Sequence, residues 1–170
     1  MRIATWNVNS VTARLPRLLP WLEDTAPDVV ALQETKCAAA AFPELPVQTL
    51  GYEVLAAGEG RWNGVAILSK LGIAAPVIDL PDHPEARMAA AKCGPLHVTS
   101  VYVPNGRTLD DPHYLYKLDW LATLRAGLDG VDPEQPRVIM GDFNVAPTDE
   151  DVFNIAAFAG STHVTPAERA

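Results

Sequence analysis

The sequence predicts a protein of the α/β class, a layered fold in which short buried strands alternate with helices. Short apolar runs bounded by Gly, Pro and Asn recur along the chain, and apolar residues between them follow helical periodicity. The chain has 170 residues, of which 48% are hydrophobic and 20% are charged. This length and composition fit one globular domain over residues 1–170, with a core that needs no disulfide or structural metal.

The N-terminal half contains a helix and the first four predicted strands. The strands are expected at residues 3–8, 29–32, 52–56 and 65–69. The last two should be neighbours joined through the turn Gly58-Glu59-Gly60. Between the first two strands, apolar residues spaced i, i+3, i+4 and i+7 predict one face of a helix; they are Leu15, Leu18, Leu19 and Leu22. Pro16 is tolerable near the start of this helix, and Pro20 is expected to kink it.

The C-terminal half contains two further predicted strands, at residues 96–103 and 137–140, with a long helix between them. Asp111-Pro112 is typical of a helix start, and Gly130 is expected to end the helix. The apolar stripe of this helix should consist of Tyr114, Leu118, Leu121, Leu124 and Leu128. The alanine run at 38–41 is interpreted as a short loop or a helix end.

The formal net charge is -8. This charge argues against a protein that coats nucleic acid without sequence preference, because such binding usually needs an excess of Lys and Arg. It is compatible with a nuclease, since a site that holds a divalent cation is rich in carboxylates and the cation supplies the charge that meets a phosphate.

The sequence carries no signal for export or for membrane insertion. Cys37 and Cys93 lack metal-ligand spacing and are too few for a disulfide framework, so we interpret them as reduced thiols. The N-terminus turns polar at Asn7 before a signal-peptide apolar region is complete, and no stretch of 18 apolar residues occurs. The expected location is the cytoplasm, without a membrane partner.

Residues that can bind a hard cation or a phosphate oxygen stand at or near the ends of four predicted strands. They are Asn7, Glu34, Tyr102, and Asp142 with Asn144. Because ligands gather at the carboxyl ends of strands in open α/β sheets, we expect these side chains to converge. Most have an ordinary alternative: Asn7 as a loop residue, Tyr102 as a core residue, and Gly141 to Asn144 as a turn. Asp142 and Asn144 should point to the same side of an extended segment, with Gly141 leaving room for a substrate backbone.

Glu34 is the carboxylate that is hardest to explain structurally. Glu34 follows a run of buried residues, where an unpaired charge costs several kcal/mol. It therefore needs a partner, either Lys36 or a metal. Mg²⁺ prefers oxygen ligands, which fits Glu34 with Asn7 and the Asp142 region. These side chains suit phosphodiester hydrolysis, in which an Asp aligns or deprotonates water while an Asn and a phenol donate hydrogen bonds to phosphate oxygens.

Five motifs, taken together, resemble those of exonuclease III-type AP endonucleases in order and approximate spacing. They are Trp6-Asn7-Val8-Asn9, Leu32-Gln33-Glu34-Thr35-Lys36, Asn63-Gly64-Val65-Ala66-Ile67-Leu68-Ser69, Tyr102-Val103-Pro104-Asn105-Gly106 and Gly141-Asp142-Phe143-Asn144-Val145-Ala146-Pro147-Thr148-Asp149. The resemblance implies a DNase I-like, four-layer α/β/β/α sandwich with two packed sheets. It also implies Mg²⁺- or Mn²⁺-dependent cleavage of double-stranded DNA 5′ to abasic sites, with 3′ to 5′ exonuclease and 3′-phosphatase activity at 3′ ends, by a monomeric full-length enzyme.

The resemblance also implies residue roles. Its metal site corresponds to Asn7, Glu34, Asp142 and Asn144. Among the catalytic positions, Tyr102 matches the active-site tyrosine, Asp142 handles the water nucleophile, and Asn144 orients the phosphate. The expected substrate-binding residues are Asn105, Arg87 and His113. A Gly-Asp-Phe-Asn segment also occurs in sphingomyelinases and inositol-polyphosphate phosphatases, whereas the Gln-Glu-Thr-Lys and Tyr-Val-Pro-Asn-Gly forms favour the repair branch.

Members of that family continue beyond the position of Ala170 to a Ser-Asp-His motif, which supplies an Asp and a His to the active site. None of the four histidines here follows a Ser-Asp pair, and we interpret each as a surface or loop residue; they are His83, His97, His113 and His163. We therefore expect this chain to be a fragment, with a strand edge and an apolar face uncovered at its C-terminal side. The alternatives are an inactive truncated DNA- and metal-binding fragment and a superfamily phosphatase or phospholipase.

Overall fold

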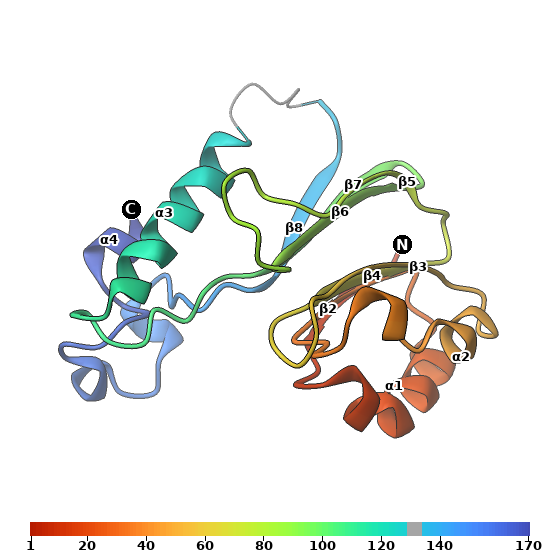
Figure 1. The fold of residues 1–170 in the computed structure, drawn as a ribbon, viewed down its shortest axis with the longest axis horizontal. Coiled ribbons are helices and arrows are strands. Elements are labelled where there is room, and N and C mark those ends of the chain that lie inside the picture. The colour runs from red at the N-terminus through yellow and green to blue at the C-terminus, as the bar shows by residue number, and fades with distance from the viewer. Residues whose placement is uncertain (129–133) are drawn as a thin grey trace. The chain divides into compact units, whose positions relative to one another are not determined.

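The computed structural model describes residues 1–128 and 134–170 (Figure 1). The described chain forms two compact units. The first unit consists of residues 1–102 and 134–142, and the second consists of residues 103–128 and 143–170. The single domain over residues 1–170 stays a prediction.

The first unit contains two four-stranded sheets that pack face to face (Figure 1). The first sheet has the order β1-β2-β4-β3, with β1 at Ile3–Asn7, β2 at Val29–Gln33, β3 at Glu53–Ala57 and β4 at Val65–Ser69. The second has the order β5-β6-β7-β8, with β5 at Ala74–Val77, β6 at Met88–Cys93, β7 at Leu96–Tyr102 and β8 at Arg137–Asp142. In each sheet one pair is parallel, β1 with β2 and β7 with β8, and the other pairs are antiparallel.

Strand β2 lies at the centre of the first unit, and all five of its residues are buried. Its side chains alternate between two cores, as the pleat of a strand requires. Val30 and Leu32 pack in the cluster that includes Leu18 and Leu22 of helix α1 (Val11–Thr25). On the other face, Val29 and Ala31 pack with residues of the second sheet, namely Ala89, Ala91, Val98 and Met140. Figure 1 shows α1 and the short α2 (Glu44–Gln48) covering the outer face of the first sheet.

The six predicted strands are confirmed, with every end within two residues of its predicted position. The alanine run forms a 3-10 turn, η1 (Ala39–Ala41), and both Pro16 and Pro20 lie inside α1. Strands β5 and β6 are not predicted from the sequence. Strand β6 reads Met-Ala-Ala-Ala-Lys-Cys, and alanine favours helices over strands, so its extended form depends on pairing with β7. Strand β5 is exposed throughout and contains Pro76, so its sequence lacks the alternation of apolar and polar residues that predicts a strand.

The second unit contains helix α3 (Pro112–Ala126), the short helix α4 (Pro166–Arg169) and the 3-10 turns η2 (Asp149–Asp151) and η3 (Ile155–Phe158). The predicted start of α3 is confirmed, because Asp111 caps it by accepting from the backbone N–H of His113 at 2.8 Å. The predicted end is wrong, since the helix stops at Ala126, before Leu128; Gly130 lies outside the described residues. Its buried residues are Lys117, Trp120 and Leu124, so of the predicted stripe only Leu124 is buried.

No helix in the described part of the chain combines the length and the hydropathy that a membrane crossing requires.

A buried ion pair joins α3 to α4 in the second unit. Lys117 Nζ lies 2.5 Å from Glu168 Oε1, and both side chains are completely buried. Burial raises the pKa of Glu168, but hydrogen bonds from Lys117, His163 and Thr165 outweigh it, so the pKa lies below its ordinary value of 4.5. Glu168 is therefore a carboxylate that the fold stabilises in its charged form.

Acid is expected to weaken the second unit through Glu168. Because the pKa of this group is lowered by folding, its contribution to stability is present above the unfolded value of 4.5 and is lost as the pH falls through the folded value. At neutral pH, Glu168→Gln should lower the free energy of unfolding by about 3 kcal/mol, since it leaves the Lys117 ammonium buried without its counter-charge. Urea unfolding at a series of pH values should show this difference shrinking in acid. If the stability difference between the unmodified chain and Glu168→Gln did not change with pH, the ionised Glu168 would not be the cause of the acid effect.

Candidate active site

Three predicted site residues meet where β1, β2 and β8 end. Asn7 is the last residue of β1, Glu34 directly follows β2, and Asp142 is the last residue of β8. The side-chain nitrogen Nδ2 of Asn7 donates to Glu34 Oε1 at 2.7 Å and to Asp142 Oδ2 at 2.8 Å. One amide group thus holds two carboxylates side by side, although Asn7 and Asp142 are 135 positions apart in the sequence.

Glu34 has several partners that stabilise its charge. Lys36 Nζ lies 2.8 Å from Glu34 Oε2, and the same ammonium donates to Asn9 Oδ1. Burial raises the pKa of Glu34, but hydrogen bonds from Lys36, Asn7 and Tyr102 and the charge of Lys36 hold it below its ordinary value of 4.5. Lys36 is therefore the partner of Glu34 that the structure shows, out of the two that the sequence leaves open. Because its pKa is lowered, the Glu34 carboxylate is ionised at neutral pH.

Tyr102 completes this group from the end of β7. It pairs in register with Asp142 of β8, and its hydroxyl donates to Glu34. Burial raises the pKa of Tyr102 to about 12, helped by the negative charges of Glu34 and Asp142 and opposed by Arg87. Tyr102 is consequently a protonated phenol at neutral pH, able to donate a hydrogen bond.

Arg87 supports Tyr102. Its guanidinium carbon lies 4.8 Å from the centre of the Tyr102 ring, and Nη1 donates to the Tyr102 carbonyl at 3.3 Å. Its Nε also pairs with Glu85, and only 7% of the side chain is exposed. The structure places Arg87 against the tyrosine, in a cation–π contact that fixes the ring. The predicted contact of Arg87 with substrate stays a prediction.

The turns that carry Glu34 and Lys36 have a strained backbone. Glu34 and Lys36 have φ values of 53° and 50°, in the left-handed region, which costs a residue with a Cβ about 1–2 kcal/mol. Backbone hydrogen bonds hold the turn in place: Lys36 N donates to Asn63 O at 3.0 Å, and Thr35 N donates to Gly64 O at 3.1 Å. Strain of this kind is typical of functional sites, where the surrounding structure maintains it.

Gly141 is required by the packing of two strands, whereas the sequence suggests that it leaves room for a substrate backbone. Its φ is 151°, and a Cβ built on it would lie 2.0 Å from the carbonyl oxygen of Val101. The missing side chain therefore makes room for the neighbouring strand β7 rather than for a substrate. This close approach of β8 to β7 sets Asp142 opposite Tyr102.

A buried polar pair behind Glu34 escaped the sequence analysis. Gln33 Nε2 donates to Ser100 Oγ at 3.1 Å, and Ser100 Oγ donates to the Leu32 carbonyl at 3.2 Å. Thr5 Oγ1 also donates to Gln33 Oε1 at 3.2 Å. These bonds link β2 of the first sheet to β7 of the second directly beside the carboxylate. A glutamine inside an otherwise apolar strand is the only sequence signal that pointed to them.

The other predicted site residues belong to the second unit. Asn144 has a φ of 50° and donates from Nδ2 to the Val103 carbonyl at 2.9 Å. Asn105 Oδ1 accepts from Arg107 N at 3.1 Å, and its Nδ2 lies 3.3 Å from His163 Nε2. His113 lies in the first turn of α3, with its ring 5.4 Å from that of Tyr116. Their roles stay predictions.

The histidines are less exposed than the sequence suggests. His83 is only 2% exposed, and His97 lies within strand β7 rather than in a loop. His113 is half-buried in α3, and His163 is half-buried in the loop before α4.

The donor set fits Mg²⁺. Among the described residues, no group of three or more His, Cys, Asp or Glu side chains is arranged to hold a metal ion. The group that does form has two carboxylates, Glu34 and Asp142, and the amide of Asn7. Oxygen donors in this number suit Mg²⁺, which proteins usually hold by one or two carboxylates while water and substrate phosphate complete the shell.

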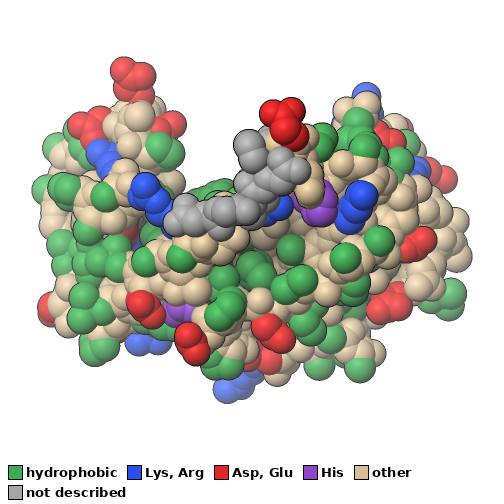
Figure 2. All heavy atoms as spheres, turned by 90° about the horizontal axis from the view of Figure 1, so that it is seen from above, with side chains coloured by type: hydrophobic (Ala, Val, Ile, Leu, Met, Phe, Trp, Pro, Cys, Tyr) green, Lys and Arg blue, Asp and Glu red, His purple; other side chains and the backbone are tan. Residues whose placement is uncertain are grey.

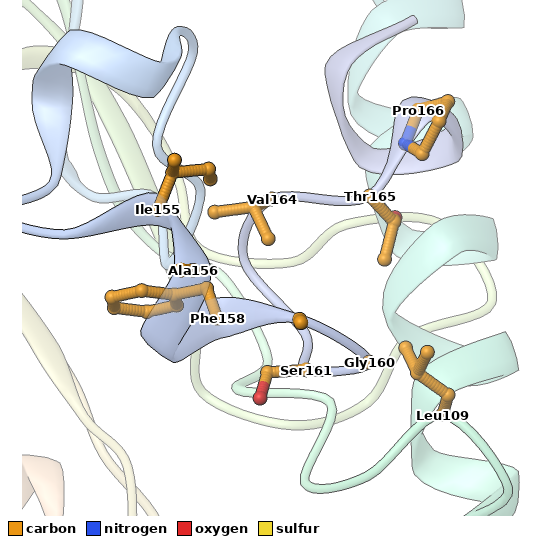
Figure 3. A pocket seen from close by; sticks show the side chains of 10 residues that line it. Leu109, Ile155, Ala156, Phe158, Gly160, Ser161, Val164, Thr165 and Pro166 are labelled. Atoms are coloured by element: carbon orange, nitrogen blue, oxygen red, sulfur yellow. The ribbon is translucent and has the colours of Figure 1, made fainter.

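The second unit contains a separate, mostly apolar cavity of about 430 Å³. Its walls include Leu109 and Phe158, and Figure 3 shows these side chains with Ile155 and Val164 around the opening. None of the predicted site residues lines it. On the face of the molecule shown in Figure 2, acidic and basic side chains are interspersed.

Comparison with protein families gives one match over nearly the whole chain. The model of the endonuclease/exonuclease/phosphatase family matches residues 4–168. DNA repair nuclease APEX1 of Danio rerio is 31% identical over 181 aligned positions, which cover 99% of this chain and 57% of that protein. Exodeoxyribonuclease III of Haemophilus influenzae is 32% identical, over 89% of this chain and 60% of that protein. The chain thus spans less than two thirds of these curated relatives.

Solved structures agree. An AP endonuclease from Archaeoglobus fulgidus superimposes with a TM-score of 0.96 and 36% identity, over 99% of this chain and 67% of that one. The 3′-5′ exonuclease NExo from Neisseria meningitidis gives a TM-score of 0.95 at 36% identity, over 99% and 68%. A further match, also at 0.95, is a 3′ phosphatase NExo bound to a product DNA hairpin. The predicted α/β fold class with two packed sheets is confirmed.

Proposed function

Because the chain belongs to the endonuclease/exonuclease/phosphatase family, we propose that it is a phosphodiester hydrolase that cleaves DNA in repair, with Mg²⁺ as its cofactor. The observation that carries the proposal is the Asn7 amide, which holds the carboxylates of Glu34 and Asp142 together at the ends of three strands. The names of the relatives, a DNA repair nuclease and an exodeoxyribonuclease, support DNA as the substrate.

The proposed metal ligands are Glu34 and Asn7, with Asp142 and Asn144 completing the set. A bound Mg²⁺, or Mn²⁺ in its place, would polarise the phosphoryl oxygen and offset charge on the leaving oxygen. The fit rests on the oxygen donors present and on the ionised state of Glu34, whose pKa is lowered by its hydrogen bonds despite its burial.

The remaining residues act on water and phosphate in this proposal. Asp142 aligns the attacking water and accepts its proton. The phenol of Tyr102, which stays protonated at neutral pH because its pKa is raised to about 12, would donate its single proton to a phosphate oxygen in place of Glu34. Asn144 is proposed to orient the phosphate. Asn105 and His113 are proposed to contact the DNA. Arg87 and Lys36 contribute by fixing Tyr102 and Glu34.

We propose abasic sites and 3′ ends of double-stranded DNA as the substrates. The support is that the solved neighbours include an AP endonuclease, a 3′-5′ exonuclease and a 3′ phosphatase. A cytoplasmic location and a monomeric state of the full-length enzyme are part of the same proposal.

Incision of a DNA duplex with one abasic analogue tests the proposal. We expect cleavage by the purified 170-residue chain with Mg²⁺ and none with EDTA. Soluble phosphoinositide and sphingomyelin are offered in parallel. Their hydrolysis, with abasic DNA left intact, would assign the chain to a phosphatase or phospholipase. Binding of DNA without cleavage by folded protein would indicate an inactive DNA-binding fragment.

A further inference from the structure

Lys117 of α3 is completely buried, and its ammonium group makes three hydrogen bonds inside the second unit. Nζ donates to the Asn144 carbonyl at 2.6 Å, to the Asn105 carbonyl at 3.3 Å and to Glu168 Oε1 at 2.5 Å. Lysine normally extends its ammonium to water, and a buried ammonium is costly unless it is paired and hydrogen-bonded. Two of the three acceptors belong to residues that are proposed to contact the DNA substrate, Asn105 and Asn144.

We propose that Lys117 is a positioning residue that fixes the two loops carrying Asn105 and Asn144. The inference rests on the proposed function for the roles of those two asparagines. Lys117 itself touches neither substrate nor metal in this proposal. It acts through the backbone carbonyls that it holds.

The bond to Asn144 holds a turn in which this residue has a positive φ. Asn144 has a φ of 50°, in the left-handed region, which asparagine adopts more readily than most residues with a Cβ. The Lys117 ammonium holds the peptide group that follows this residue. The Asn144 side chain then donates to the Val103 carbonyl at 2.9 Å, and the loop is bound again where Ala146 N donates to His163 O at 2.7 Å.

The loop at Asn105 packs directly against the lysine stem. A Cβ added to Gly106 would lie 3.1 Å from Lys117 Cδ and 3.2 Å from Thr162 Cγ2, closer than an ordinary contact, so the stem passes where a side chain would otherwise stand. This packing gives a reason for the glycine in the Tyr-Val-Pro-Asn-Gly motif. It also means that the lysine constrains this loop through its stem as well as its charge.

Glu168 holds the ammonium in place. Its Oε1 accepts from His163 N at 2.9 Å as well as from Lys117, and its Oε2 accepts from Thr165 N at 3.0 Å. The carboxylate therefore has a fixed orientation of its own. The Lys117 ammonium thus binds Glu168 of α4 and the carbonyls of Asn105 and Asn144 at the same time. Through Lys117, helix α4 supports both loops.

The test compares two variants of the full chain. Lys117→Met with Glu168→Gln removes both buried charges together, which avoids the large destabilisation that one unpaired buried charge would cause. Leu124→Ala, in the same helix, is the control, because it removes a buried apolar side chain and none of the hydrogen bonds from Lys117 or Glu168. Steady-state cleavage of abasic DNA gives kcat and KM. Hydrogen exchange at the Ala146 amide and at the Asn144 side-chain amide reports on the loop without needing activity.

We expect the double variant to lose about 100-fold in kcat with a smaller change in KM, because a small displacement of a positioned group is enough for such a loss. Exchange at the two reporter amides should accelerate beyond what the change in global stability explains. When compared at the same folded fraction, the Leu124→Ala control should show neither the loss in kcat nor the faster exchange at the two reporter amides.

Unchanged kcat and protection in the double variant, or equal losses in the control, would overturn the proposal. If the unmodified chain does not cleave DNA, that result counts against the proposed function alone. The exchange measurement then decides the role of Lys117 by itself.

Discussion

Replacing Glu34 by Gln is expected to reduce Mg²⁺-dependent DNA cleavage by at least about 100-fold, the loss typical when one electrostatic contact in an active site is removed. The change keeps the shape of the side chain but removes the charge that Asn7, Lys36 and Tyr102 stabilise. A neutral amide is a weaker ligand for Mg²⁺, and the Lys36 ammonium, 2.8 Å from Glu34, loses its counter-charge. Single-turnover cleavage across a Mg²⁺ titration measures the effect.

The matched control is Glu44→Gln, which neutralises an exposed glutamate in α2 whose side chain bonds to Gln48. It should cleave at the unmodified rate. If Glu34→Gln retained full activity at saturating Mg²⁺ while EDTA still abolished cleavage, the metal would have to bind elsewhere and the proposed ligand set would be wrong.

Gly141→Ala is expected to lower the free energy of unfolding by about 3 kcal/mol or more, because the new Cβ would lie 2.0 Å from the Val101 carbonyl oxygen. That atom belongs to backbone in the middle of a sheet, so it cannot move aside as a flexible side chain would. Relief requires β8 to separate from β7, which also moves Asp142 away from Tyr102. Cleavage should therefore fall even in the fraction that remains folded. Urea unfolding followed by circular dichroism gives the stability change.

Gly60→Ala separates the clash from backbone strain. Gly60 has a φ of 132°, close to that of Gly141, but a Cβ there would meet no atom within 4 Å. Its substitution should cost only the strain of the conformation, about 1–3 kcal/mol, and should leave cleavage intact. Equal destabilisation by the two substitutions would show that the approach of β8 to β7 is not the reason for the glycine.

Local sequence patterns determined much of the fold. Alternating apolar runs and turn residues located six of the eight strands in the described residues and both longer helices. An element that is buried on one face shows a regular spacing of apolar residues in its sequence. The strand β6 was missed for the same reason: its alanines carry no strand preference, and only the pairing with β7 makes it extended.

The sequence by itself determined which side chains stand at the strand ends, and with them the chemistry proposed for Asn7, Glu34, Tyr102 and Asp142. Only the tertiary structure decided how they are held: the single amide of Asn7 between two carboxylates, Arg87 against the tyrosine ring, and Lys117 buried between two loops. Periodicity reports the burial of a residue on its own element, whereas these contacts join segments far apart in the chain. A lysine in a helix or a glycine in a strand shows its partner only when the fold brings the two together.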